Sequence, residues 1–324
     1  MKNAVILLVW ALALSVFAEE SRYYPVYRME NAPQIDGELD DAVWNKIPLA
    51  GGFFVFRGNG EYAVEKPTEF RAGWTQDAIY LAIRCVESDP GKIQSRYKDE
   101  GALDGDDSVE LLFSPMEGPS WVQLIVNAKG SRCNGRYSSS GPEKVWGWEA
   151  KTKVGANYWN VEIKVPMGVI GMAPGTGARW RVNIARNLLT GPPGERFTAW
   201  PLLSKGFHEL ARFGVFEFKE TVLNEAEAGK ASQGNEKFYG EFLKKQLGII
   251  QSEAGKYRKA LDQGAEMERL KAESEELGNL WTLTGRLSTG SCPWWEMSEA
   301  FPKCSKLIER SEDFKAKVNL EKLF

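Results

Sequence analysis

Histidine is almost absent from this sequence, which contains one such residue, His208, among 324. Because histidine is the usual acid–base group near neutral pH and a common metal ligand, this scarcity argues against histidine-based catalysis and against a multi-histidine metal site. A surplus of positive charge is also lacking: 41 Lys and Arg residues are outnumbered by 44 Asp and Glu residues, for a net charge of −3. Nucleic-acid binding needs a concentrated basic surface, so we expect no nucleic-acid partner.

An apolar run long enough to span a membrane is also lacking. The stretch Ala4–Phe17 is shorter than the roughly 20 residues that a spanning helix needs. It follows Lys2 and ends next to Ala18, the order of charge, apolar segment and small residue that is typical of a secretory signal peptide. We therefore predict that residues 1–18 are a signal peptide and that the mature protein is exported, to a periplasm or outside the cell, without a membrane span.

Cysteine is scarce, with four residues. In an exported chain they could form two disulfides, and pairing Cys85 with Cys133 and Cys292 with Cys304 is the simplest of the three arrangements that four cysteines allow. The spacing does not select among the three. A catalytic thiol is less expected, because no histidine lies nearby in the sequence to activate one.

Up to about residue 218 the sequence has the period-two alternation of β-strands. In Trp159–Val165 apolar and polar residues alternate strictly until Pro166, as in a strand with one buried face. The other short β-prone runs are 70–74, 78–83, 108–113, 122–126, 180–185 and 213–218. Many strands joined by glycine- and proline-containing turns predict that residues 19–218 form a mainly β domain, a jelly-roll-like antiparallel β-sandwich.

After Lys219 the composition changes to Ala, Glu, Lys and Leu, with apolar residues at helical spacing. We predict an α-helical C-terminal region over 219–324, with helices at about 235–260, 264–278 and 298–320. A loop containing Trp294 and two of the cysteines would precede the last helix. The charged helical faces indicate contact with solvent, and a protein partner for these helices is the alternative.

Four segments of the β region occur in an order that resembles one known family. They are IDGELDDAVW at 35–44, DDSVELLF at 106–113, VEIKVP at 161–166, and a closing segment with AWP at 199–201, FH at 207–208 and RFG at 212–214. This ordered set is similar to family-9 carbohydrate-binding modules and their DOMON-like relatives. The resemblance does not extend beyond Lys219. It implies a non-catalytic β-sandwich that binds a poly- or oligosaccharide through one face.

The resemblance implies that Glu110 hydrogen-bonds sugar hydroxyls, a task that suits a carboxylate because it accepts bonds from adjacent donors. Strand parity places Val109 and Leu111 on the core face and Glu110 on the opposite, ligand-accessible face. A solvated surface carboxylate is the alternative. Two tryptophans sandwich the sugar in the family, and their positions correspond here to Asp104 and Phe207, so one aromatic platform is lost and the other is replaced by a different ring.

Strand parity also nominates other residues of the ligand face. Gln123 and Asn127 share one side of a strand, Asn183 lies opposite the apolar residues of another, and Arg186 is expected in the loop that follows. An arginine that contacts sugar in the family corresponds to Ile125. Replacement aromatic platforms could come from Trp74, Trp121, Trp146 or Trp148, of which Trp146-Gly147-Trp148 is the most loop-like; packing in the core is the alternative for each. The predicted carbohydrate-binding residues are Glu110, Phe207, Asn127, Gln123, Asn183, Arg186, Trp74 and Trp148.

The acidic loop Asp104, Asp106 and Asp107 is a candidate calcium site, since Ca²⁺ prefers clustered oxygen ligands. The resembling modules carry structural calcium. A plain acidic turn is the alternative, and no other cofactor is expected.

Three further function classes stay open. The family is often attached to glycoside hydrolases, but hydrolysis needs two carboxylates beside a cleft, and the helical region is small for such a site. Some DOMON-like proteins bind haem, for which His208 could pair with Met29, Met116 or Met167. An envelope adaptor whose sandwich has lost sugar binding is the main alternative to a glycan-binding protein.

Overall fold

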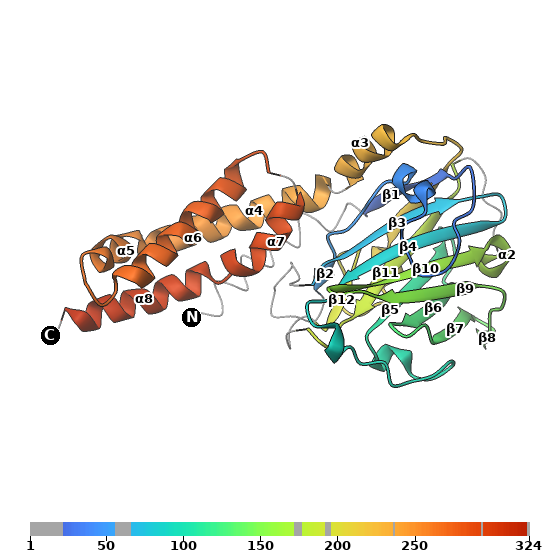
Figure 1. The fold of residues 1–324 in the computed structure, drawn as a ribbon, viewed down its shortest axis with the longest axis horizontal. Helices are drawn as coiled ribbons and strands as arrows, with labels where there is room; N and C mark the ends of the chain where they lie inside the picture. The colour runs from blue at the N-terminus through green and yellow to red at the C-terminus, as the bar shows by residue number, and fades with distance from the viewer. Residues whose placement is uncertain are drawn as a thin grey trace. The chain divides into compact units, whose positions relative to one another are not determined.

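A computed structural model describes residues 22–55, 66–171, 177–191, 196–235, 237–292 and 294–322. The chain forms two compact units, Met1–Asn235 and Glu236–Phe324, the first built around a β-sheet and the second α-helical (Figure 1). The predicted signal peptide lies outside the described residues. Among the helices that are described, none is long and apolar enough to cross a membrane.

Every strand predicted from the alternation is present. The strands of the first unit are β1 (Tyr23–Arg28), β2 (Phe54–Val55), β3 (Thr68–Trp74), β4 (Ala78–Val86), β5 (Ser108–Pro115), β6 (Trp121–Asn127), β7 (Arg132–Ser138), β8 (Gly141–Glu143), β9 (Glu149–Val154), β10 (Tyr158–Pro166), β11 (Arg179–Asn187), β12 (Phe197–Ala199) and β13 (Gly214–Lys219). Its short helices are η1 (Ala42–Lys46), η2 (Pro90–Lys92), η3 (Leu103–Gly105), α2 (Met167–Ile170), η4 (Leu210–Arg212) and α3 (Glu225–Asn235).

These strands form one continuous sheet in the order β8-β7-β6-β5-β11-β13-β1-β3-β4-β10-β9, with β12 joining β11 to β2. The sheet curls on itself (Figure 1). Strand β1 runs parallel to both of its neighbours, β13 and β3, whereas β3, β4, β5, β6, β10 and β11 pair in antiparallel fashion. The prediction of β-strands followed by helices is confirmed, but a wholly antiparallel sandwich is wrong. Alternation encodes which face of a strand is buried and not its direction, and β1 has no hairpin to fix its direction.

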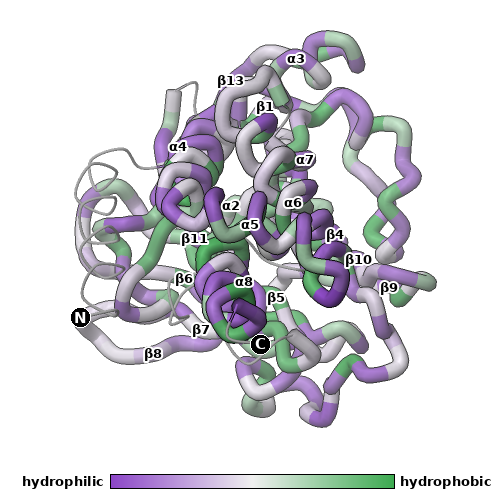
Figure 2. Tube along the Cα trace, turned by 90° about the vertical axis from the view of Figure 1, so that its left-hand side faces the viewer, coloured by the Kyte–Doolittle hydropathy of each residue, from purple (hydrophilic) through white to green (hydrophobic). Residues whose placement is uncertain are grey.

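The core fills the inside of the curl. Val109, Leu111 and Phe113 of β5 belong to the same buried cluster as Ile79 and Leu81 of β4, in the other half of the sheet. Three indoles, those of Trp159, Trp180 and Trp200, are almost completely buried. Figure 2 shows hydrophobic and hydrophilic residues succeeding one another along the traces of the strands. The period-two alternation thus places one apolar face of each half against the other.

A second, smaller cluster covers the outer face of β4 and β10, and the opening motif of the sequence builds it. Trp44 packs there, and its indole N–H donates to Oε1 of Glu162 at 2.8 Å. The backbone N–H groups of Asp36 and Gly37 donate to Oε2 of the same carboxylate, each at 3.0 Å. Gly37 has a φ of +92°, which favours glycine. The opening motif therefore has a structural role, with Glu162 as its partner.

The second unit is helical, as predicted, with different boundaries. Its helices are α4 (Lys237–Ala254), η5 (Gly255–Tyr257), α5 (Arg258–Ala265), α6 (Lys271–Thr289), α7 (Trp294–Cys304) and α8 (Leu307–Glu321). Helix α4 packs along α6 and α7, and its apolar residues Phe242 and Leu243 are buried. The loop predicted around Trp294 is wrong, because Trp294, Met297 and Phe301 follow helical spacing and are buried in α7.

The four cysteines are free thiols, so the predicted disulfide pairs are wrong. Cys85 lies in the inner core on β4, where burial raises the pKa of its thiol to about 11. Cys133 of β7 pairs with Ile125 of β6, which lies opposite Glu110 on the outer face of the sheet. Two such distant positions cannot be bridged without moving the strands.

Gly214, in the closing RFG motif, allows the packing of the core to be tested. A Cβ added to Gly214 would lie 2.2 Å from Cζ3 of Trp200, too close for any real contact. We expect Gly214→Ala to lower the free energy of unfolding by about 1–3 kcal/mol, the usual cost of overpacking. Denaturant unfolding of the full chain measures this. Gly206→Ala is the control, because its added Cβ would meet nothing within 4 Å; an equal loss in both variants would contradict the steric explanation.

Candidate functional site

Glu110 lies on the outer face of the sheet, as strand parity predicts, but it is not solvated. Its side chain is 3% exposed. Gln123 Nε2 donates to its Oε2, and Asn187 Nδ2 donates to its Oε1, both at 2.7 Å. Burial raises the pKa of Glu110, and these two hydrogen bonds oppose that increase. Two side-chain amides therefore hold a carboxylate that retains free lone pairs on both oxygens.

Strand register explains why these three residues meet. Glu110 of β5 pairs with Ile125 of β6 and with Ala185 of β11, so Gln123 and Asn187, each two residues along its strand, flank it on the same face. Asn187 was not predicted, since the expected strand ended at residue 185. A strand two residues longer, with the same parity, would have included it.

Other ionisable groups surround this carboxylate. The charge of Asp104 raises the pKa of Glu110, and Glu110 in turn contributes to the raised pKa values of Cys133 and Tyr137, where burial is the larger cause. Asp104 is exposed, and Cys133 and Tyr137 are half-buried. The position where the resembling family has a tryptophan is thus an exposed carboxylate near Glu110.

Phe207 covers the neighbouring part of the face. It is buried in a cluster with Ala185 and Leu203, and its ring lies edge-on to Phe197 at 6.1 Å. Asn183 Nδ2 donates to the carbonyl oxygen of Phe207 at 3.0 Å, which fixes the covering segment to β11. Phe207 and Asn183 therefore border Glu110, but Phe207 presents little of its ring to solvent.

An aromatic group lies along the same face. The rings of Trp121 on β6 and Tyr137 on β7 stack with centroids 5.0 Å apart and planes 13° apart. The exposed His208 lies at 5.8 Å from Trp121, and its Nε2 is 3.4 Å from Oε1 of Gln123. Partial desolvation lowers the pKa of His208, so its ring is neutral at pH 7.

Asn127 and the acidic loop form a structural turn. Asn127 Nδ2 donates to Asp106 Oδ2 at 2.9 Å, and its Oδ1 accepts the backbone N–H groups of Lys129 and Ser131. Asp106 and Asp107 are buried and accept further backbone N–H groups, from residues 94, 96, 97 and 189. In the part of the chain that the structure describes, no cluster of three or more His, Cys, Asp or Glu residues could hold a metal. These contacts favour the acidic-turn interpretation over the calcium site.

Arg186 lies within β11 and not in a loop, so that expectation is wrong. Its guanidinium is fully buried, donates to the carbonyl oxygens of Lys66 and Val86, and lies 3.8 Å from a carboxylate oxygen of Glu87. In register it pairs with Val109, a core residue, and so it faces the inside of the curl. Arg186 therefore lies on the opposite side of the sheet from Glu110.

Two of the predicted tryptophan platforms lie in the core. Trp74 is 4% exposed, and Trp148 is 5% exposed. Trp146, by contrast, is 76% exposed. The expectation of an exposed loop pair is thus confirmed for Trp146 and wrong for Trp148, whose carbonyl oxygen accepts a bond from Arg132 and whose ring lies beneath the same guanidinium.

The haem pairings with the two buried methionines do not form. Met29 packs with Trp44 on the outer face of β4, and Met167 packs in the inner core. His208 lies against Trp121, on the outer face of β6.

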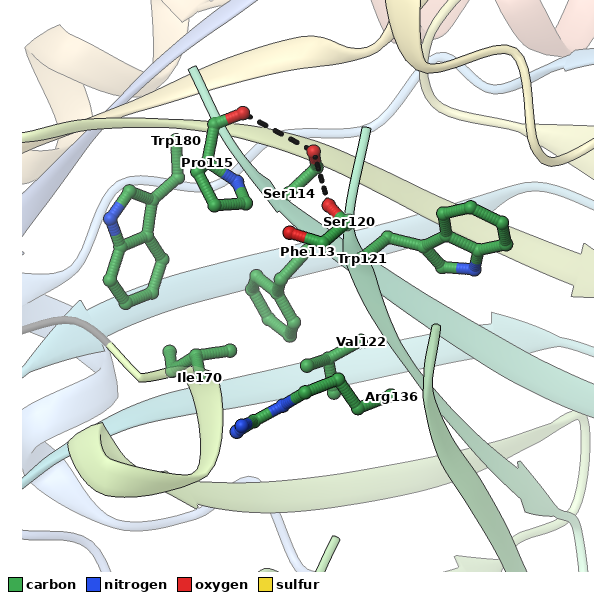
Figure 3. A pocket seen from close by; sticks show the side chains of 9 residues that line it. All are labelled: Phe113, Ser114, Pro115, Ser120, Trp121, Val122, Arg136, Ile170 and Trp180. Carbon is green, nitrogen blue, oxygen red and sulfur yellow. Dashed lines mark hydrogen bonds between the residues drawn. The ribbon is translucent and has the colours of Figure 1, made fainter. Parts of the chain in front are cut away.

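A cavity of about 40 Å³ opens at the end of the β5–β6 hairpin (Figure 3). Phe113, Val122 and Trp180 line it, and Ser114 Oγ donates to the carbonyl oxygen of Ser120 at 2.9 Å. This volume accommodates a few water molecules and not a sugar ring. The outer face around Glu110 is therefore the stronger candidate site.

Comparison with known proteins supports the fold. The chain is similar to a candidate carbohydrate-binding protein from Bacteroides uniformis, with a TM-score of 0.50 and 16% identity over 62% of this chain and 100% of that one. Two structures of a family-9 carbohydrate-binding module from Caldicellulosiruptor kristjanssonii, in complex with cellotriose and with glucose, give TM-scores of 0.45 and 0.46. Their identities are 15% and 17%, over 61% and 62% of this chain and 95% and 98% of theirs.

No family model and no curated protein matches the sequence. The structural similarity nevertheless confirms, for the fold, the resemblance to carbohydrate-binding modules that the four motifs indicated. It leaves the ligand and the contact residues to be argued from this chain's own geometry.

A polar residue of this face that holds a turn should affect the stability of the protein when it is replaced. We expect Asn127→Ala to lower the free energy of unfolding by about 1–3 kcal/mol, because it leaves buried partners such as Asp106 and the N–H groups of the turn without their hydrogen bonds. Denaturant unfolding of the full chain measures this loss. Lys129→Ala, in the same turn with an exposed side chain, is the control. An Asn127→Ala chain as stable as the parent would contradict the structural role.

Proposed function

We propose that the first unit is an exported, non-catalytic carbohydrate-binding module that takes a poly- or oligosaccharide on the outer face of β5, β6 and β11. The observation that carries this proposal is the carboxylate of Glu110, held by Gln123 and Asn187 beside the aromatic pair of Trp121 and Tyr137. A carboxylate, amides and aromatic rings on one face are the groups that recognise the hydroxyls and the C–H surface of a sugar.

The two amides leave Glu110 able to accept hydrogen bonds from a ligand. Each of its oxygens accepts one N–H, and the second lone pair of each can accept a sugar hydroxyl. Gln123 and Asn187 also carry acceptor oxygens, and their terminal groups can donate to the ring oxygen or a hydroxyl of a sugar. Because water is largely excluded, a hydrogen bond to this carboxylate would be charge-assisted and strong.

Binding is favoured over hydrolysis. Glu110 and Asp104 provide two carboxyl groups near one another, the number that glycoside hydrolysis requires. The carboxylate of Glu110 is enclosed, however, and both of its oxygens already accept amide hydrogen bonds. A general acid or nucleophile must instead reach the glycosidic bond directly. We therefore assign Glu110 to ligand binding, with the signal peptide delivering the module outside the cytoplasm.

One observation favours an adaptor as the second candidate. Each oxygen of Glu110 already accepts one hydrogen bond within the protein, and only 3% of the residue is exposed. A sandwich that had lost sugar binding would have the same closed arrangement. A folded protein that binds no glycan would support the adaptor, and the experiment below separates the two.

Replacing Glu110 tests the glycan site. We expect Glu110→Gln to lower oligosaccharide affinity at least tenfold, since the loss of a hydrogen bond to a charged group costs about 1.5–3 kcal/mol. Calorimetric titration of the full chain with cello-, xylo-, manno- and laminari-oligosaccharides measures it. The free energy of unfolding at pH 7 should be unchanged or higher. A carboxyl group whose pKa is raised in the folded state destabilises that state when it ionises.

Glu117→Gln is the matched control, because Glu117 is exposed on the β5–β6 hairpin. It should bind as the parent does. Equal affinities for the parent, Glu110→Gln and Glu117→Gln would remove Glu110 from the site, and the absence of binding from a folded parent would overturn the glycan proposal itself.

The pH dependence of binding follows from the buried carboxylate. Burial raises the pKa of Glu110 above its usual 4.5, so acidification should protonate it and weaken binding at a higher pH than for an exposed glutamate. Affinity should fall as the pH is lowered. His208 also changes charge in acid, and the Glu110→Gln chain isolates its contribution. A parent profile identical to that of the variant would contradict the assignment.

A further inference from the structure

The stacked pair of Trp121 and Tyr137 is more exposed to solvent than Glu110. Glu110 and Gln123 are 3% and 8% exposed, whereas Trp121 and Tyr137 are half-buried and His208 is exposed. A ligand that reaches Glu110 must therefore gain most of its contact area elsewhere on the face. The aromatic pair, on the neighbouring strands β6 and β7, offers apolar surface on the same face.

The indole of Trp121 belongs to the outer face and not to the core. Figure 3 shows its ring directed away from Phe113 and Trp180, which point into the inner cavity. Tyr137, its partner on β7, leans over Gly135, where an added Cβ would lie 3.0 Å from Cε2 of the tyrosine ring. The missing side chain at Gly135 thus lets the tyrosine ring lie against the strand.

The aromatic pair is continuous with the carboxylate. Gln123 is two residues from Trp121 on the same face of β6; its Nε2 donates to Glu110, and its Oε1 lies 3.4 Å from Nε2 of His208. His208 in turn lies against Trp121. Trp121 and Ile125, the residue opposite Glu110, are four positions apart, a rise of about 13 Å along a strand. The face is longer than one sugar ring.

We propose that Trp121 and Tyr137 form a second sugar subsite, so that the module recognises an internal stretch of an oligosaccharide along the outer face of β5, β6 and β7. This inference rests on the glycan-binding function proposed above. One sugar residue binds through its hydroxyls at Glu110 and Gln123. Another places its C–H face against the exposed part of the aromatic pair, with His208 beside it as a neutral donor or acceptor.

This arrangement has a consequence for chain length. A monosaccharide binds through its hydroxyls at Glu110 and gains little contact area there. An oligosaccharide joins both, and the second contact is then made at a high effective concentration. Affinity should therefore rise steeply from one sugar unit to three or more, whichever glycan is preferred.

Calorimetric titration of the full chain tests the subsite with glucose, cellobiose, cellotriose and cellohexaose, and with xylose, mannose and β-1,3-glucan series of the same lengths. We expect the parent to bind its preferred trisaccharide at least tenfold more tightly than the monosaccharide. Trp121→Ala should remove about tenfold of trisaccharide affinity, as loss of a ring that stacks on a ligand does. It should leave monosaccharide binding unchanged. Tyr137→Ala provides the same test if Trp121→Ala does not fold.

Trp146→Ala is the matched control, because Trp146 is 76% exposed but lies on the connection between β8 and β9. It should bind every sugar as the parent does. Binding that depends on Glu110 but neither on chain length nor on Trp121 would overturn the second subsite and leave the glycan-binding function standing. A folded parent that binds none of the sugars would overturn both.

Discussion

One sheet has to supply both layers of the core, and this constraint governs the first unit. Because the sheet curls on itself, each long strand must keep an apolar face toward the inside, as Leu111 and Leu81 do from opposite halves. Polar residues that alternate with this apolar face, such as Glu110 and Gln123, are then directed to the outer face, and Arg186 is an exception that faces inward. Recognition of a ligand by strand residues is confined to that outer surface, since the interior is filled by indole and phenyl rings.

Two buried carboxylates on this outer surface show how the same residue type serves different purposes. Glu162 is held by the backbone N–H groups of Asp36 and Gly37 and by the indole of Trp44, so it fixes one segment to the sheet. Glu110 is held by two side-chain amides that can rotate. Burial raises the pKa of both. The identity of the donors, fixed backbone or adjustable side chain, separates a structural carboxylate from a candidate binding group.

The sequence was informative about faces and less so about partners. Period-two alternation located seven of the thirteen described strands and put Glu110 on the correct side, because burial is encoded residue by residue. It could not give the parallel direction of β1, the inward position of Arg186 or the burial of Trp148, since each depends on segments far away in the sequence. The turn and the tryptophan of the opening motif have local steric reasons. Its partner Glu162 lies far away in the sequence and could not be predicted.

Strand β1 brings together segments from opposite ends of the first unit. It is the first described element, yet its neighbours in the sheet are β3 and, in parallel register from Tyr23 opposite Val215, the last strand, β13. Pairings between such distant segments make folding slow, because the loop must close before the contacts form. The curl cannot be completed until the ribosome has released residues beyond β13. A nascent chain would remain open for most of its synthesis, a delay that is compatible with the proposed export.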